Sequence, residues 1–534
     1  MDFAALTDIP WQMIALTVMS LSLGWGIRGN FGHESGAAMP GALAAMAVAL
    51  MSGRPDWWER AHLFAMFGAL GWSLGGSMSY MQVIAFTHSG HTPSILYGFA
   101  NLGVIGFCWA ALGGLGVGVA ALFDGATLAL FGLPIVLVLA GWALQEMVVD
   151  AIAFRNAGRR HESRLYWYDT DWLEVLVAAV AVLIVVAVRG GFDPATTLIL
   201  YLGVGWYGAF LLLVNVLGLR MTPPRGDNWA GCVGMVVGAS AYCWRFGYGD
   251  LAFAMWMTGA IGGAGYSLSQ AIKLACIRTG LRTNWHSVLE QTQGAFHGLG
   301  LAVAMGVLAQ RPPVPPSEGV PGWLHVVAVA FTLLLLTYVN HRKATLTWIE
   351  QVASLPERFY RIPTAGWFRQ SRGWIGWFEL VYIAIGVAVV WIGVAHLRTP
   401  LPFLPDGALG RGQLLFVSFM WWIVVFNFER ALTGFTPTRI ITEGAITWNA
   451  VACTVLVCLG ATSVVLAEPR GDGVSAPTAV VMAGLGVASV TVVGWAIAKA
   501  LFGSDHISDA GLHIRFGPNR TATKQRPTRG SAHP

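Results

Sequence analysis

Long apolar runs recur along almost the whole of this chain and limit the folds that it can adopt. About fifteen such runs lie between Trp11 and Phe502, and each approaches the roughly 20 helical residues that cross about 30 Å of hydrocarbon. In that solvent a helix satisfies its backbone polar groups internally. Charged residues make up 11% and hydrophobic residues 55% of the 534 residues, whereas soluble domains carry about 25% charged residues. The sequence therefore predicts an all-α polytopic integral membrane protein with about fifteen transmembrane helices.

The basic residues are distributed unevenly over the connections between these runs. Connections that follow odd-numbered runs, together with the C-terminal tail, hold 22 lysines and arginines, while the opposite set holds 8. Because cytoplasmic loops retain most Lys and Arg, we expect a cell (inner) membrane protein with its N-terminus outside and its C-terminus in the cytoplasm. The opening stretch MDFAALTDIP has no basic residue and no small-residue cleavage site, so we do not expect a signal peptide.

Two parts of the sequence resemble each other in the same order. The stretch FAMFGALGWSLGGSMSYMQ (64–82) resembles FAMWMTGAIGGAGYSLSQ (253–270), and WLEVLVAAVAVLIVV (172–186) resembles WFELVYIAIGVAVVW (377–391). An even number of helices per copy gives both copies the same orientation. We therefore predict a parallel duplication of a six-helix unit, plus three extra helices; chance similarity between glycine-rich apolar helices is the alternative.

The first pair of matching stretches also shares a glycine pattern. One copy carries Gly71 and Gly75, and the other carries Gly259 and Gly263. Glycines four residues apart let two membrane helices approach closely. We therefore expect both stretches in the core of the bundle.

The duplication sets the expected domain boundaries. The first six-helix unit spans 1–192, and the second spans 193–410 with a basic, aromatic-rich cytoplasmic loop at 341–374. We expect that loop to form a helix on the inner leaflet. Three further helices occupy 411–502, and a basic cytoplasmic tail that we expect to be partly disordered follows at 503–534.

One short stretch, NWHSVLEQTQGAFHG, places polar side chains at the mouth of an apolar run. Its members His286, Glu290, Gln293 and His297 share one face of a helix, because they follow at intervals of four, three and four residues. Ionisable groups inside a membrane are costly unless they face a bundle interior or water. We therefore expect this polar stripe to line an interior cavity open to the cytoplasm, as candidates for substrate binding or proton coupling. A capped interfacial helix is the alternative.

The turn RGNFGHESG, on the expected cytoplasmic side, supplies further candidates. It carries Arg28, His33 and Glu34, and the equivalent turn of the second copy carries Asp227. An arginine beside a carboxylate in equivalent turns predicts a charged vestibule around the pseudo-symmetric centre. Ordinary positive-inside turns with acids at helix starts are the alternative.

Two carboxylates share a face in the run WALQEMVVDAIAFRN. Glu146 and Asp150 are four residues apart. Two carboxylates this close repel each other when both are ionised, so one of them would hold a proton, as a proton-coupled carrier requires. A pair solvated near the interface, or neutralised by Arg155 and Arg159, is the alternative.

Several function classes lack their motifs here. The sequence contains no phosphate-binding loop, GxSxG elbow, dinucleotide fingerprint or zinc-protease helix, and its six cysteines include no CxxC pair. A His and a Glu four residues apart suit a metal, but two ligands do not make a site, so we expect no metal and no cofactor. The net charge of +5 is explained by topology and anionic lipid rather than by nucleic acid. The expected partners are membrane lipids and a small-molecule or lipid-linked substrate.

Three functions fit these features. The first is a membrane transporter, namely a secondary permease for a polar or amphipathic solute, which could be proton-coupled. It fits a duplicated domain that holds ionisable residues and has no nucleotide motif. An integral-membrane enzyme, a transferase or hydrolase on a lipid-linked substrate, fits polar residues that crowd one face, with His33 and Glu34, or His286 and Glu290, as acid and base. A structural subunit of a membrane complex is the third. The transporter is our leading hypothesis.

The charge asymmetry makes a direct prediction about the two ends of the chain. In intact cells a C-terminal tag should be protected from a membrane-impermeant label, because the basic connections hold that end in the cytoplasm. An N-terminal tag should be labelled and serves as the control. Labelling of the C-terminal tag from outside would contradict the topology.

Overall fold

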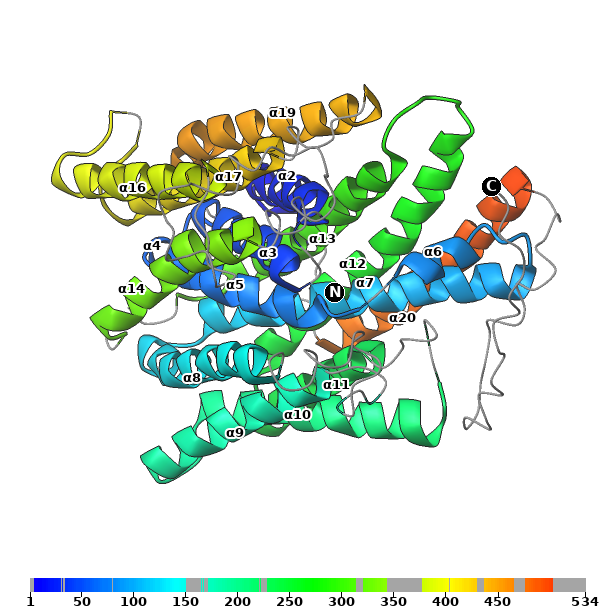
Figure 1. The fold of residues 1–534 in the computed structure, drawn as a ribbon, viewed down its shortest axis with the longest axis horizontal. Helices are drawn as coiled ribbons and strands as arrows, with labels where there is room; N and C mark the ends of the chain where they lie inside the picture. The colour runs from blue at the N-terminus through cyan, green and yellow to red at the C-terminus, as the bar shows by residue number, and fades with distance from the viewer. Residues whose placement is uncertain are drawn as a thin grey trace.

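The computed structural model describes residues 4–502 except for 30, 32–33, 79, 150–164, 166, 168–170, 220, 222–227, 314–319, 343–376, 403, 430–436 and 465–475. The described part is all-helical, without β-strands (Figure 1). Most of the expected cytoplasmic loop and the whole C-terminal tail lie outside the described residues.

The helices follow one another with short connections. The first part of the chain forms α1 (Ala4–Thr7), α2 (Trp11–Arg28), α3 (Glu34–Leu50), α4 (Pro55–Trp58), α5 (Ala61–Gly75), α6 (Met81–Phe86), α7 (Thr92–Leu122), α8 (Gly125–Val149) and α9 (Asp171–Arg189). The middle part forms α10 (Pro194–Ala209), η3 (Phe210–Val216), α11 (Asn228–Phe246), α12 (Gly249–Ile277), α13 (Trp285–Ala309), α14 (Gly322–Ala330), η4 (Phe331–Leu336) and α16 (Trp377–Arg398). The last part forms α17 (Gly407–Glu429), α19 (Pro437–Gly460), η7 (Ala461–Ser463) and α20 (Ala476–Phe502).

Many of these helices suit a membrane. Among the described residues, 10 helices are long and apolar enough to cross a bilayer. Two others, α3 and α5, are apolar but shorter, with 17 and 15 residues. The all-α architecture is thus confirmed, and ten candidate membrane-spanning helices agree with a multi-pass membrane protein, while the count of fifteen crossings stays a prediction.

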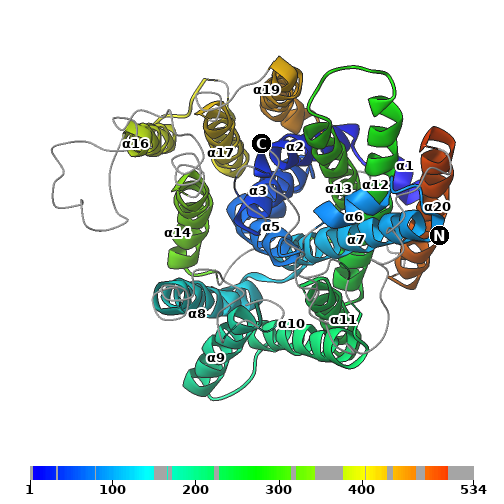
Figure 2. The same cartoon turned by 45° about the vertical axis from the view of Figure 1, so that its right-hand side comes forward.

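The most deeply buried helices form a central group between two outer sets. Helices α2, α3, α5, α7, α12 and α13 pack against one another in the centre. Figures 1 and 2 show α16, α17 and α19 along one side of this group and α8, α9 and α10 along the opposite side. The outer helices expose many large apolar side chains, as expected for surfaces that face lipid.

Both glycine pairs pack against the same helix, α7. On α5, a β-carbon at Gly71 would stand 2.4 Å from the carbonyl oxygen of Leu112, and one at Gly75 would stand 2.5 Å from the Trp109 ring. Because lipid provides no hydrophobic drive between helices, close van der Waals contact must hold them together. The glycines on α5 permit that contact.

The second glycine pair contacts α7 from α12. A β-carbon at Gly259 would stand 2.7 Å from the Phe107 ring, and one at Gly263 would stand 2.7 Å from the carbonyl oxygen of Gly103. Helix α7 is therefore held closely by α5 and by α12.

The packing does not confirm a two-fold duplication. The repeat would make α5 equivalent to α12 and α7 equivalent to α13. Helix α7 packs extensively along α12, but α5 and α13 share no comparable contact among the described helices. The duplicated six-helix unit therefore stays a prediction.

The connections that follow even-numbered apolar runs lie together at one end of the bundle. At one end, Arg54 donates to the carbonyl oxygen of Arg311 at 2.9 Å, and Arg60 donates to that of Phe123 at 2.8 Å. Arg311 also pairs with Asp250 at 3.2 Å. All of these residues follow even-numbered apolar runs, as an alternating membrane topology requires. Which end faces the cytoplasm stays a prediction.

The close packing of α5 on α7 predicts that Gly71→Ala destabilises the protein. The added methyl group would overlap the α7 backbone, and overpacking of this kind costs about 1–3 kcal/mol. Gly208→Ala is the matched control, because Gly208 lies within α10 and a β-carbon there would meet nothing within 4 Å. Thermal unfolding in detergent measures both variants. Equal melting temperatures would contradict the packing argument.

Candidate functional site

A buried ion pair joins α2 to α13. Arg28 is the last residue of α2, and Glu290 lies in the second turn of α13. Arg28 Nη2 lies 3.0 Å from Glu290 Oε1, and the two side chains are only 1% and 4% exposed. A buried charge is costly unless it is paired and hydrogen-bonded, so the position of each residue depends on the other.

Tyr80 completes a triangle with this pair. It is buried immediately before α6. Arg28 Nη2 donates to the Tyr80 hydroxyl at 2.8 Å, and that hydroxyl donates to Glu290 Oε1 at 2.5 Å. One carboxylate oxygen therefore accepts hydrogen bonds from a guanidinium and a phenol.

Aromatic rings surround the guanidinium of Arg28. Its central carbon lies 4.9 Å from the centre of the Trp25 ring, 4.7 Å from that of Trp109 and 5.5 Å from that of Tyr80. The electron-rich faces of aromatic rings attract a cation, most strongly where water is absent. These rings therefore replace part of the hydration that Arg28 loses by burial.

Local sequence explains why α13 presents Glu290 here. Asn284 caps the start of α13 by accepting a hydrogen bond from the Ser287 backbone at 3.3 Å. Gly29 follows α2, where a β-carbon would stand 2.8 Å from Glu290 Oε2. At Gly294 a β-carbon would stand 2.4 Å from the carbonyl oxygen of Leu21. Small residues on both helices thus allow the carboxylate to reach the end of α2.

The polar stripe of α13 runs from the surface to the interior. The His286 side chain is 41% exposed, and its Nε2 lies 3.5 Å from Glu290 Oε1. Gln293 and His297, one and two turns deeper, are fully buried. The His297 ring meets the Trp25 ring edge-on, with centroids 5.0 Å apart. The structure thus joins Glu290 to Arg28 directly, His286 to the same carboxylate, and His297 to Arg28 through the Trp25 ring, while Gln293 lies buried on the same face.

Several polar atoms beside this cluster have no hydrogen-bond partner among the residues that the structure describes. They are the side-chain oxygen and nitrogen of Gln293, both ring nitrogens of His297, the Tyr266 hydroxyl, the Trp25 indole nitrogen and Nε of Arg28. A buried polar group without a partner costs about 1–3 kcal/mol. A polar ligand or water at this place would supply the missing hydrogen bonds.

The other sequence candidates do not join this cluster in the described structure. Glu34 is exposed at the start of α3, and Glu146 is exposed in the last turn of α8. His33, Asp150 and Asp227 lie outside the described residues. The charged vestibule and the carboxylate pair therefore stay predictions.

The structure adds four aromatic residues that the sequence did not single out. Trp25 lies three residues before Arg28 and so shares its helix face, which is a signal that the sequence contains. Tyr80, Trp109 and Tyr266 come from three other segments, and only the fold brings them to Arg28.

Two pockets that the structure describes lie elsewhere, one between α10 and α11 and one beside α8 and η4. An open cavity beside the stripe therefore stays a prediction. Among the described residues, no group of three or more His, Cys, Asp or Glu side chains is placed to hold a metal ion. No family model, curated protein or solved structure matches the chain.

The buried pair predicts a strongly non-additive double mutant. Glu290→Gln alone leaves the Arg28 charge uncompensated, and breaking a buried pair in this way costs about 3–5 kcal/mol. Adding Arg28→Met removes that charge and should recover most of the loss. Thermal unfolding of the two single variants, the double variant and the parent protein measures the coupling. Additive losses would show that the two residues do not depend on each other.

Proposed function

We propose that this protein is a membrane transporter, a secondary permease for a polar or amphipathic solute, with proton coupling. Its binding and coupling site is the cluster of Arg28, Tyr80, Glu290 and His297. The observation that carries the proposal is the buried Arg28–Glu290 pair, which lies within an apolar bundle beside polar groups that have no partner among the described residues. The proposal includes about fifteen helices, a duplicated six-helix unit, and an inner membrane with the N-terminus outside.

A structural role explains the pair less well than a functional one. Apolar residues of similar volume often replace a buried ion pair without loss of stability. Ionisable residues within a membrane domain mark substrate or proton paths more often than structural contacts. The unpartnered nitrogens of His297 and amide of Gln293 would be a further cost for a purely structural cluster.

The geometry suggests how a proton and a solute would compete. A proton on Glu290 would remove the charge that holds Arg28, and Arg28 would then be free to bind an acceptor group of a solute. His286, exposed at the edge and 3.5 Å from Glu290, gives the proton a route to the aqueous side. Release of the solute would restore the Arg28–Glu290 pair.

An enzyme is the second candidate, and the exposed edge of the cluster favours it. His286 and Glu290 lie close enough to act as a general acid and base, and Tyr80 offers a phenolic proton. A lipid-linked substrate would approach from the end of the bundle where His286 is exposed. Such an enzyme would turn over its substrate in detergent, where no gradient exists.

Transport can be tested in proteoliposomes that contain a pH-sensitive dye. Addition of a panel of amino acids, carboxylates and sugars should reveal a solute whose entry acidifies the interior. His297→Gln and the double variant Arg28→Met with Glu290→Gln should abolish that acidification, because they remove groups that bind the solute or the proton.

The matched control is Asp406→Asn, which changes an exposed carboxylate immediately before α17 and outside the cluster and should retain acidification. Size-exclusion chromatography checks that each variant is folded. Full transport by the folded cluster variants, or turnover of a lipid-linked substrate in detergent, would overturn the proposal that this protein is a transporter.

A further inference from the structure

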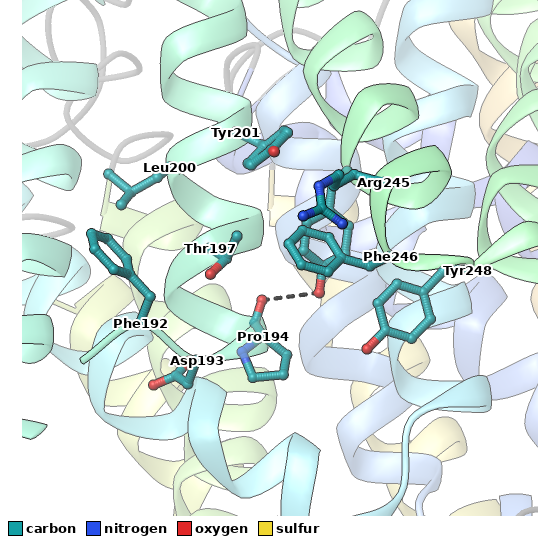
Figure 3. A pocket seen from close by; sticks show the side chains of 10 residues that line it. Phe192, Asp193, Pro194, Thr197, Leu200, Tyr201, Arg245, Phe246 and Tyr248 are labelled. Atoms are coloured by element: carbon teal, nitrogen blue, oxygen red, sulfur yellow. Dashed lines mark hydrogen bonds between the residues drawn. The ribbon is translucent and has the colours of Figure 1, made fainter.

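A pocket of about 560 Å³ opens between the start of α10 and the end of α11 (Figure 3). Phe192, Thr197 and Tyr201 line it from the α10 side, and Arg245 and Tyr248 line it from the side of α11 and the turn that follows. This pocket lies at the end of the bundle where the even-numbered connections gather. The Arg28 cluster lies at the opposite end.

The one cation of the pocket has no anionic partner among the described residues. Arg245 is exposed, and its guanidinium lies over the Phe246 ring at 5.5 Å. The carboxylate of the pocket, Asp193, is already used, because it pairs with Arg189 at 2.5 Å and caps α10 by accepting from the Thr196 backbone at 2.8 Å. The pocket therefore carries a positive charge that no described carboxylate neutralises.

The remaining polar side chains of the pocket are hydroxyls, which can donate hydrogen bonds as well as accept them. The hydroxyls of Thr197 and Tyr201 make no hydrogen bond to another described residue, and Figure 3 shows both on the α10 wall that Arg245 faces. A guanidinium with nearby hydroxyls suits the oxygens of an anion, and Arg binds phosphate well through paired N–H donors.

The surface beside the pocket is apolar. Val204 of α10 and the residues Val237 and Trp244 of α11 are exposed, Trp244 by 87%. Large exposed apolar side chains on membrane helices face lipid, and tryptophan is enriched where a helix reaches the interface. An anionic group at Arg245 would thus sit at headgroup level with acyl chains beside these helices.

We propose that this pocket binds the phosphodiester of a membrane phospholipid. Arg245 pairs with the phosphate, and the hydroxyls of Thr197 and Tyr201 donate to its oxygens. The acyl chains lie along the exposed apolar faces of α10 and α11. The proposal requires a membrane location but not a transport function.

Native mass spectrometry of the full chain in detergent tests this site with phosphatidylglycerol as the probe. Arg245→Gln should weaken binding about tenfold, as loss of a charge-assisted hydrogen bond does. Arg245→Lys should recover part of the affinity, since it keeps the charge but not the paired donors. Tyr201→Phe, which removes one hydroxyl and keeps the ring, should weaken binding to a smaller extent.

Arg398→Gln is the matched control, because Arg398 is exposed at the end of the apolar helix α16 and does not line the pocket. It should bind phosphatidylglycerol as the parent protein does. Diacylglycerol, which lacks the phosphate, and glycerophosphoglycerol, which lacks the acyl chains, should both bind at least tenfold more weakly. Unchanged binding by Arg245→Gln, or equal binding of diacylglycerol, would overturn the proposal. Equal binding of glycerophosphoglycerol would also overturn it, by showing a site for a soluble anion.

Discussion

The ion pair between Arg28 and Glu290 is the interaction on which the centre of this protein depends. Withdrawing two charges from water carries a penalty of several kcal/mol per ion, and the surrounding structure offsets it. Tyr80 donates to the carboxylate, and the rings of Trp25 and Trp109 lie against the guanidinium. Four separate segments must therefore meet at one point, which fixes how α2, α7 and α13 lie with respect to the start of α6.

Helix α7, one of those four segments, is held in place by its close contacts with glycines of α5 and α12. Helix α7 carries Trp109, whose indole nitrogen donates to the carbonyl oxygen of Trp72 on α5 at 3.2 Å. That hydrogen bond depends on the close approach of α5, which Gly71 and Gly75 permit. Packing by small residues, the main source of helix association in lipid, thus also sets the position of a ring that contacts Arg28.

The periodicity of the sequence predicted which side chains share one face of the same helix. The polar stripe from His286 to His297 shares one face, and its deeper members face the bundle interior. Arg28 and Glu290 entered as members of separate features, a turn and a stripe, and their pairing could not be foreseen because it joins residues 262 positions apart. Tyr80 and Trp109 carried no local signal for the same reason. The duplication rested on similarity between glycine-rich helices, and such similarity reflects shared packing on α7 as readily as a shared origin.

Burial gives the arginines at the two ends of the bundle different chemistry. Arg245 is exposed, so water compensates its charge, and an anion that binds there exchanges solvent for a partner at little cost. Water cannot compensate the charge of Arg28 in this way, because its side chain is only 1% exposed. Any group that displaces Glu290 from Arg28 must bring its own acceptor atoms, or the guanidinium is left with an uncompensated charge at a cost of about 3–5 kcal/mol. Under the proposed function, a solute that entered this cluster would therefore have to carry an anionic or strongly accepting group, because an uncharged apolar molecule would leave the Arg28 charge without a partner.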